Sequence, residues 1–321
     1  MPTDLLIHET VLRRFADLLR GGRLAHAYLL IGPEGVGKFE TALAVAKLVN
    51  CEAGAREAGC GQCAACRKIA ALYHPDLHIL KCARGETIKI DDIRSLIAHA
   101  QLKPFEAKRK IFILCNTENL TIEGGNALLK TLEEPWADSL LLLTTSVPEK
   151  NLATVRSRCQ AIHFFSYSSD KLADYLANDY HVEEGTARFL AAFAQGSWGR
   201  AKQLYDSHFL QRRNEIIDNV IFSPDSDAYF KKILADKGQT KELLDVLLAW
   251  FRDLLLIKLG AGENRLMHRD RQNDLQRLSL SFSCEDIQEI IRQIIRVMKL
   301  LNDNLNVKIA LTLVKEKIWV K

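Results

Sequence analysis

A glycine-rich loop followed by a lysine is the strongest chemical signal in the sequence. Residues 32–38 read Gly-Pro-Glu-Gly-Val-Gly-Lys and fit the phosphate-loop pattern G-x-x-x-x-G-K. In such a loop the backbone N–H groups attract phosphate oxygens, and the lysine reaches the β- and γ-phosphates. Gly32, Gly35, Gly37 and Lys38 are therefore candidate ligands of a nucleotide such as ATP.

The same region lacks the groups that metal-assisted hydrolysis needs. The residue after Lys38 should carry a hydroxyl for Mg²⁺, and here it is Phe39. Thr41 lies two residues further on and would point about 200° away on a helix. The next buried strand should end in acidic residues that organise Mg²⁺ and activate water, but Cys115 and Asn116 occupy those positions. We therefore expect ATP binding that is weak or absent, and no Mg²⁺-dependent hydrolysis.

Four of the eight cysteines are clustered in one short segment. The spacing is C-x8-C-x2-C-x2-C, and the residues are Cys51, Cys60, Cys63 and Cys66. Four thiolates can form a closed tetrahedral shell around structural zinc, and clustered cysteines in a cytosolic chain indicate metal more often than disulfides. The alternative is four free thiols. His74 and His78 follow the cluster, but we interpret them as ordinary polar residues because the cysteines already complete a shell.

One arginine stands between two small residues in Ser157-Arg158-Cys159. The tripeptide comes after the apolar run 140–145 and the break at Val147-Pro148, which predicts a position just beyond a strand. Arginine is always charged and its guanidinium forks onto phosphate oxygens. An arginine supplied in trans is a known device of nucleotide hydrolysis. We expect Arg158 to serve a neighbouring subunit's nucleotide, and the simpler alternative is a surface arginine on a loop.

Composition sets limits on the class of protein. The chain has 321 residues, 48% of them hydrophobic, and a net charge of +4, which suits two or three globular domains without a global basic field. No apolar run approaches the roughly 20 residues that a membrane span needs. The N-terminal residues lack the basic start and apolar core of a signal peptide. The expected location is the cytoplasm, with no membrane partner.

Alternating strands and helices must position the motifs of the first half. Apolar runs predict strands at 24–31, 110–116 and 140–145, with a shorter one within 73–80. Helical spacing predicts helices at 5–20, 40–49, 90–102 and 126–135. This order is typical of a parallel sheet with helices on both faces. Thr145 would then lie at the carboxyl end of a strand, beside the crevice where such sheets bind ligands.

The second half reads as helical throughout. Helices are predicted at 169–178, 183–194, 197–205, 240–259, 285–301 and 307–320. Their apolar faces could form a core of their own or cover partner subunits, and the pattern alone does not separate these alternatives. The basic residues of this half are interpreted as solvated: Arg265, Arg269, Arg271, Lys308 and Lys315.

A basic loop lies in the first half around Pro104-Phe105. Its charged residues are Lys103, Lys108, Arg109 and Lys110. A solvated loop and a contact with nucleic-acid backbone explain this composition equally well, so both stay open.

Together the motifs resemble the bacterial clamp-loader subunits of DNA polymerase III, a branch of the AAA+ ATPases. The resemblance covers nearly the whole chain and is carried by His26-Ala27-Tyr28, the phosphate loop, the clustered cysteines, Asn126 to Pro135, and Ser157-Arg158-Cys159. It implies an arginine finger at Arg158, zinc on the four cysteines, and a sensor-1 residue at or beside Thr145. It also implies an AAA+ domain at 1–165 with a zinc insert at 51–66, a three-helix lid at 166–208 and an all-α oligomerisation collar at 209–321.

Within this family some subunits are ATP-hydrolysing motors, named gamma and tau, and one branch does not hydrolyse ATP. Phe39, Cys115 and Asn116 depart from the motor pattern, as does Gly199, which stands where motors usually carry an arginine. The resemblance therefore implies a non-hydrolysing stator that assembles with delta and gamma/tau and helps load the sliding clamp (beta) on primer–template DNA. The alternatives are an active gamma-like ATPase and, outside replication, a zinc-stabilised nucleotide-sensing or DNA-binding module.

Overall fold

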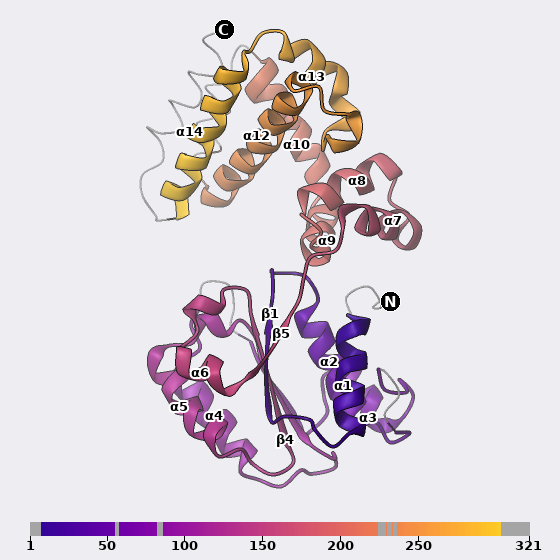
Figure 1. The fold of residues 1–321 in the computed structure, drawn as a ribbon, viewed down its shortest axis with the longest axis vertical. Coiled ribbons are helices and arrows are strands. Elements are labelled where there is room, and N and C mark those ends of the chain that lie inside the picture. The colour runs from indigo at the N-terminus through magenta and orange to yellow at the C-terminus, as the bar shows by residue number, and fades with distance from the viewer. Residues whose placement is uncertain are drawn as a thin grey trace. The chain divides into compact units, whose positions relative to one another are not determined.

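The computed structural model describes residues 8–54, 58–81, 86–223, 229, 233 and 236–302. The helix predicted at 307–320, with Lys308 and Lys315, lies outside the described residues, as does the start of the helix predicted at 5–20. The chain forms two compact units, one of residues 1–167 with 197–199 and one of residues 168–196 with 200–321 (Figure 1).

One parallel five-stranded sheet organises the first unit, in the order β2-β3-β4-β1-β5. The strands are β1 (Ala27–Ile31), β2 (Leu77–Leu80), β3 (Lys110–Leu114), β4 (Ser139–Thr145) and β5 (Gln160–His163). Every residue of β3 and β4 is buried, which explains their unbroken apolar runs. The sequence did not predict β5, because Ile162 is its one buried residue and no apolar run marks it.

Helices cover both faces of this sheet, as the family resemblance implies. They are α1 (Glu9–Arg20), α2 (Lys38–Asn50), α3 (Ala64–Ala70), α4 (Ile90–Ala100), α5 (Ile122–Glu133) and α6 (Ala153–Arg158). In Figure 1, α1 to α3 lie on one side of the sheet and α4 to α6 on the other. Successive strand residues face opposite sides. Ile113 of β3 joins the core under α1 and α2, and Leu114 joins the core on the other face.

The second unit is helical in its described part. Its helices are α7 (Ser169–Tyr180), α8 (Glu184–Phe193), most of α9 (Trp198–Asp206), α10 (Phe209–Ile217), α12 (Lys237–Lys258), α13 (Gln272–Ser279) and α14 (Cys284–Asn302). A π-helical turn follows α10 at Asp218–Phe222. The chain also has short 3-10 turns at Thr117–Asn119, Pro148–Lys150, Glu263–Arg265 and Arg269–Arg271.

Burial of α12 explains the length of its apolar pattern. Trp250, Phe251 and Leu254 are fully buried, and α12 packs along α13 and α14. A parallel sheet with helices on both faces, followed by a helical region, agrees with the predicted fold class, while the division of that region at residue 208 stays a prediction. No helix among the described residues is long and apolar enough to cross a membrane.

Candidate functional site

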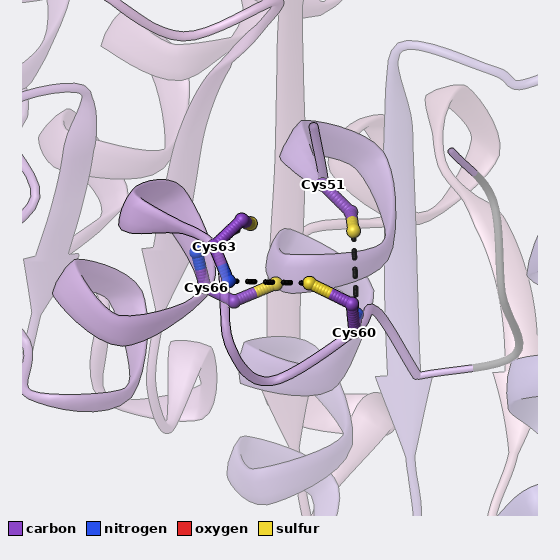
Figure 2. Close-up of side chains that lie close together, drawn as sticks. All are labelled: Cys51, Cys60, Cys63 and Cys66. Atoms are coloured by element: carbon purple, nitrogen blue, oxygen red, sulfur yellow. Dashed lines mark hydrogen bonds between the residues drawn. The ribbon is translucent and has the colours of Figure 1, made fainter. Parts of the chain in front are cut away.

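The four clustered cysteines converge on one point beside α2 and α3. Cys51 is the C-cap of α2, Cys60 lies in the loop that follows, Cys63 is the N-cap of α3 and Cys66 lies within that helix. Figure 2 shows their sulfur atoms facing one another, and all four Sγ atoms lie within 4.8 Å of each other. A tetrahedral zinc ion with Zn–S bonds of about 2.3 Å spaces its sulfurs about 3.8 Å apart, so the cluster fits zinc after a small contraction.

Backbone N–H groups already surround the sulfurs. The amide of Cys60 donates to Cys51 Sγ (3.3 Å), that of Cys63 to Cys60 Sγ (3.2 Å), and that of Cys66 to Cys63 Sγ (3.4 Å) (Figure 2). The N–H groups of Cys63 and Gln62 lower the pKa of Cys60 to about 6. Burial raises the pKa of Cys66 to about 12, so this thiol needs a nearby cation to ionise. The donor set fits a closed, structural metal site.

The phosphate loop has the expected backbone, but its lysine turns back onto it. Gly35 (φ 77°) and Gly37 (φ 94°) adopt the left-handed region that the loop requires. Lys38 Nζ donates to the carbonyl oxygens of Gly32 (2.6 Å) and Pro33 (2.7 Å), and the side chain is buried. Burial lowers the pKa of Lys38, and the Glu118 carboxylate opposes that shift. A nucleotide could use this lysine only after displacing both carbonyl contacts.

Phe39 and Thr41, which follow Lys38 in the sequence, do not supply a metal ligand. Phe39 is half-buried against the core under α1 and α2, and the Lys81 ammonium lies 3.2 Å from its ring centroid. Thr41 is fully buried, and its hydroxyl donates to the carbonyl of Gly37 (2.8 Å). The magnesium hydroxyl of a working ATPase therefore has no substitute at these positions.

The ends of β3 and β4 are held by internal hydrogen bonds. Cys115 is buried just beyond β3, and Asn116 adopts a left-handed conformation (φ 57°) with its N–H on Thr144 Oγ1 (3.1 Å). Thr145 is fully buried, and its Oγ1 accepts from Asn151 Nδ2 (2.9 Å). The structure thus places the expected sensor-1 residue at the carboxyl end of β4 but engages its hydroxyl within the chain.

Glu118 is the carboxylate that acts most strongly on Lys38. Burial raises the pKa of Glu118, but bonds from the hydroxyl and N–H of Ser146 outweigh this and lower it. Oε1 accepts from Ser146 Oγ at 2.5 Å. Glu118 therefore stays ionised, yet it lies two residues beyond the strand-end position at Asn116 and is bound to Ser146, the residue after β4.

Residues 197–199 belong to the same unit as the phosphate loop. Ser197 Oγ donates to the Glu34 carbonyl (2.8 Å), and the N–H of Gly199 donates to the Gly35 carbonyl (2.9 Å). A Cβ atom on Gly199 would lie 2.9 Å from the Gly35 Cα. An arginine at this position, as in the motors, is therefore excluded unless the backbone shifts. The adjacent Arg200 is paired with Asp245 of the second unit (3.3 Å).

Arg158 lies at the end of a short helix and not on a loop directly after β4. The 3-10 turn at 148–150 and α6 intervene, which the sequence pattern missed because α6 buries one residue, Val155. Arg158 Nη2 pairs with Glu133 Oε1 at 2.6 Å, and Nη1 donates to the Thr154 carbonyl (3.1 Å). The side chain remains 34% exposed, so the guanidinium is held in place and still accessible.

The basic side chains of the loop around Pro104-Phe105 are less free to contact nucleic acid than the composition suggests. Lys108 Nζ donates to the Cys51 carbonyl (2.6 Å), and the buried Lys110 donates to the His99 carbonyl (2.7 Å). Half of the four charged residues therefore hold the loop against the unit. Lys103 is exposed, so the nucleic-acid alternative depends on fewer charges than expected.

Sequence reasoning missed three supporting residues. His8 Nε2 contacts the Val36 carbonyl (2.8 Å) and its ring stacks on Tyr167, which braces the phosphate loop. Glu133 pairs with Arg158, and Asn151 fixes Thr145. Glu133 lies inside the quoted Asn126 to Pro135 motif, so motif membership was its one signal. A lone histidine and a lone asparagine in loops carry no such signal.

Both halves of the chain are similar in sequence to known proteins. Residues 7–168 match the family described as "DNA polymerase III, delta subunit", and residues 207–315 match "DNA polymerase III, delta subunit, C terminal". The chain is 29% identical over 310 residues to DNA polymerase III subunit delta' of Bacillus subtilis, covering 94% of this chain and 93% of that protein.

Two further relatives cover less of the chain. DNA polymerase III subunit delta' of Pseudomonas aeruginosa is 34% identical over 204 residues, which is 62% of each protein. DNA polymerase III subunit tau of Escherichia coli is 35% identical over 208 residues, 63% of this chain but 32% of tau.

Proposed function

The chain belongs to the DNA polymerase III delta subunit family, and from that premise we propose that it is a delta prime-type stator of a bacterial clamp loader. It assembles with the delta and gamma/tau subunits and helps them load the sliding clamp on primer–template DNA in the cytoplasm. It does not hydrolyse ATP itself. The observation that carries the proposal is an accessible Arg158 in a chain whose own phosphate loop lacks a metal hydroxyl and a strand-end carboxylate.

Arg158 acts in this proposal on ATP bound by a neighbouring motor. Charge spreads over the transferred phosphoryl oxygens in the transition state, and a guanidinium placed there in advance stabilises it. In the isolated chain Glu133 holds that guanidinium (2.6 Å). Because both side chains are partly exposed, the pair is weak enough to open when a phosphate competes for the arginine.

The four cysteines would hold structural zinc. The ion would link the C-cap of α2 to α3 across the loop between them. It would neutralise the Cys60 thiolate, which backbone N–H groups already favour, and would supply the cation that the buried Cys66 needs to ionise. It would take no part in nucleotide chemistry, since four cysteines leave no open position.

The rival function is a gamma-like ATPase, which the 35% identity to tau favours. Steady-state ATPase of the purified chain with Mg²⁺ and primed DNA separates the two. The stator proposal expects no turnover above background, because Phe39 and Cys115 cannot bind Mg²⁺. Robust turnover that Lys38→Ala abolishes would establish the motor instead.

A further inference from the structure

The second unit contains a cavity lined by arginines that the proposed function does not use. Its volume is about 190 Å³, and it lies among α7, α8, α12 and the segment 264–269. Four of the lining residues are arginines: Arg188, Arg252, Arg265 and Arg269. Two of them, Arg265 and Arg269, were interpreted from the sequence as solvated. Like charges gathered at one cavity repel each other, so such a cluster favours a bound anion.

The wall that carries these arginines is built on a buried carboxylate. Asp253 of α12 is fully buried and accepts hydrogen bonds from the N–H groups of Met267 (2.9 Å) and His268 (2.8 Å). It also contacts His268 Nδ1 (2.9 Å) and Arg252 Nη1 (2.8 Å). The segment that bears Arg265 and Arg269 is therefore fixed in place before any ligand arrives.

The arginine charges are only partly neutralised. Arg269 donates to the carbonyl oxygens of Leu266 and Asn264, which satisfy its N–H groups without cancelling its charge. Among the described residues Arg265 has no carboxylate partner. Arg188 pairs with Glu184 at an exposed position, where such pairs are weak. Arg252 is paired with Asp253 (2.8 Å), and Asp170 is the one acidic residue among the described residues that line the cavity, so the other arginines leave it positively charged.

The start of α7 adds backbone donors to the same wall. Ser169 and Asp170 line the cavity and are the first two residues of this 12-residue helix. The Ser168 side chain accepts from the Lys171 N–H, which leaves the N–H groups of Ser169 and Asp170 without an intrahelical partner. The positive end of the helix dipole favours an anion at this place.

An adjoining cavity of about 360 Å³ shares Arg188, Arg269 and Asp170 and adds Asp174. The two carboxylates repel an anion on that side. The favourable position is therefore the arginine side, next to Arg252 and Arg265.

We propose that this cavity binds the phosphate of a small soluble phosphorylated ligand. Guanidinium groups match phosphate oxygens in planar, two-bonded contacts, and four arginines line this cavity. A volume of about 190 Å³ suits a group of diphosphate size and is too small for a nucleic-acid strand. The site is separate from the phosphate loop, since every lining residue belongs to the second unit.

The test is isothermal titration of the full chain with inorganic pyrophosphate in a Lys38→Ala background, which removes the phosphate-loop lysine. Saturable binding is expected. Arg265→Ala should weaken it at least about 10-fold, because a charge-assisted contact is lost. Asp170→Asn should tighten it. The matched control is Arg296→Ala on α14, an exposed arginine away from the cavity, which should change nothing.

Arg265→Gln and Arg269→Gln repeat the test with the stem retained, and thermal melting confirms that each variant is folded. Pyrophosphate binding that Arg265→Ala and Arg269→Gln leave unchanged would overturn the proposal. A single-stranded oligonucleotide without terminal phosphate forms the second arm. If it binds through Arg265 and pyrophosphate does not displace it, the phosphate comes from nucleic acid and the small-ligand proposal is wrong.

Discussion

At the scale of single residues, two of the motifs that carry the family resemblance meet in one ion pair. Glu133 lies in the Asn126 to Pro135 motif and is the last residue of α5, and Arg158 lies in the Ser157-Arg158-Cys159 motif. Glu133 Oε1 and Arg158 Nη2 are 2.6 Å apart. At 52% and 34% exposure the pair adds little to stability. Its effect is to limit the rotamers of Arg158, so that the guanidinium is ordered in the free chain, as the proposed action on a neighbouring nucleotide requires.

Gly199 stands at the position where the family resemblance leads us to expect an arginine in ATP-hydrolysing subunits. Gly199→Ala should lower the free energy of unfolding by about 1–3 kcal/mol, because the new Cβ would lie 2.9 Å from the Gly35 Cα. Urea unfolding measures the change. Gly262→Ala is the matched control, since no atom lies within 4 Å of its Cβ position. Equal stability of the two variants would show that the phosphate loop does not constrain residue 199.

The Asp76 carboxylate stabilises the loop at 105–107, and this stabilisation depends on pH. Burial raises the pKa of this 2%-exposed carboxyl, but hydrogen bonds from the N–H groups of Glu106, Phe105 and Ala107 outweigh it and lower the pKa. The folded pKa lies below the unfolded one. The stabilisation is therefore present at neutral pH and is lost as pH falls through the folded value, below about pH 4.

Asp76→Asn should therefore lower the free energy of unfolding by about 1–3 kcal/mol at pH 7, and this difference from wild type should shrink below pH 4. Urea unfolding at several pH values measures it. Asp179→Asn, at an exposed site, is the control and should be neutral throughout. A difference that persists unchanged at low pH would show that Asp76 contributes by packing and not as an anion.

At the scale of elements, the cysteine segment should depend on its metal. Cys63→Ser, or a chelator, should release about one zinc per chain and lower the melting temperature, because metal binding is coupled to folding of such segments. Zinc should also dissociate as pH falls, because the cysteine thiols must lose their protons to bind it and burial raises the pKa of Cys66 to about 12.

Metal analysis by plasma mass spectrometry checks the stoichiometry. Cys284→Ser, outside the cluster on α14, should keep the zinc. If the wild-type chain carries no zinc after purification without chelators and cannot be loaded, the four cysteines are free thiols and the metal prediction is wrong.

The elements that sequence reasoning recovered are those with long buried patterns. The runs at 110–116 and 140–145 predicted β3 and β4, because every residue of these strands is buried. The short elements α3, α6 and β5 were missed, since they bury few residues and their packing depends on the rest of the sheet. Tertiary context decides such segments, and local pattern does not.

The candidate sites divide in the same way. The cysteine cluster could be predicted because its spacing limits how far apart the sulfurs can lie. The turned-back side chain of Lys38 and the engaged hydroxyl of Thr145 could not, because both depend on side-chain rotamers and on partners six residues away that no sequence pattern marks. The absence of Mg²⁺-binding and water-activating side chains could be predicted directly from the residue types at Phe39, Cys115 and Asn116.

At the scale of the whole molecule, the proposed function makes this chain a subunit that contributes to catalysis only through an assembly. Its sheet unit has the phosphate-loop backbone but carries Phe39 and Cys115 where metal-binding side chains are expected, and its Arg158 is accessible. Such a chain should bind partners and change their ATPase without turnover of its own.

The most direct test is the DNA-stimulated ATPase of a complex reconstituted from this chain, delta and gamma/tau. Arg158→Ala should reduce the rate about 10-fold or more, because an arginine supplied in trans can raise kcat by about 10³-fold. Arg156→Ala, exposed on the same helix α6, should leave the rate within about 2-fold as a control, because a surface arginine away from the phosphate adds little. An Arg158→Ala complex that assembles normally and hydrolyses ATP at the wild-type rate would contradict the central claim.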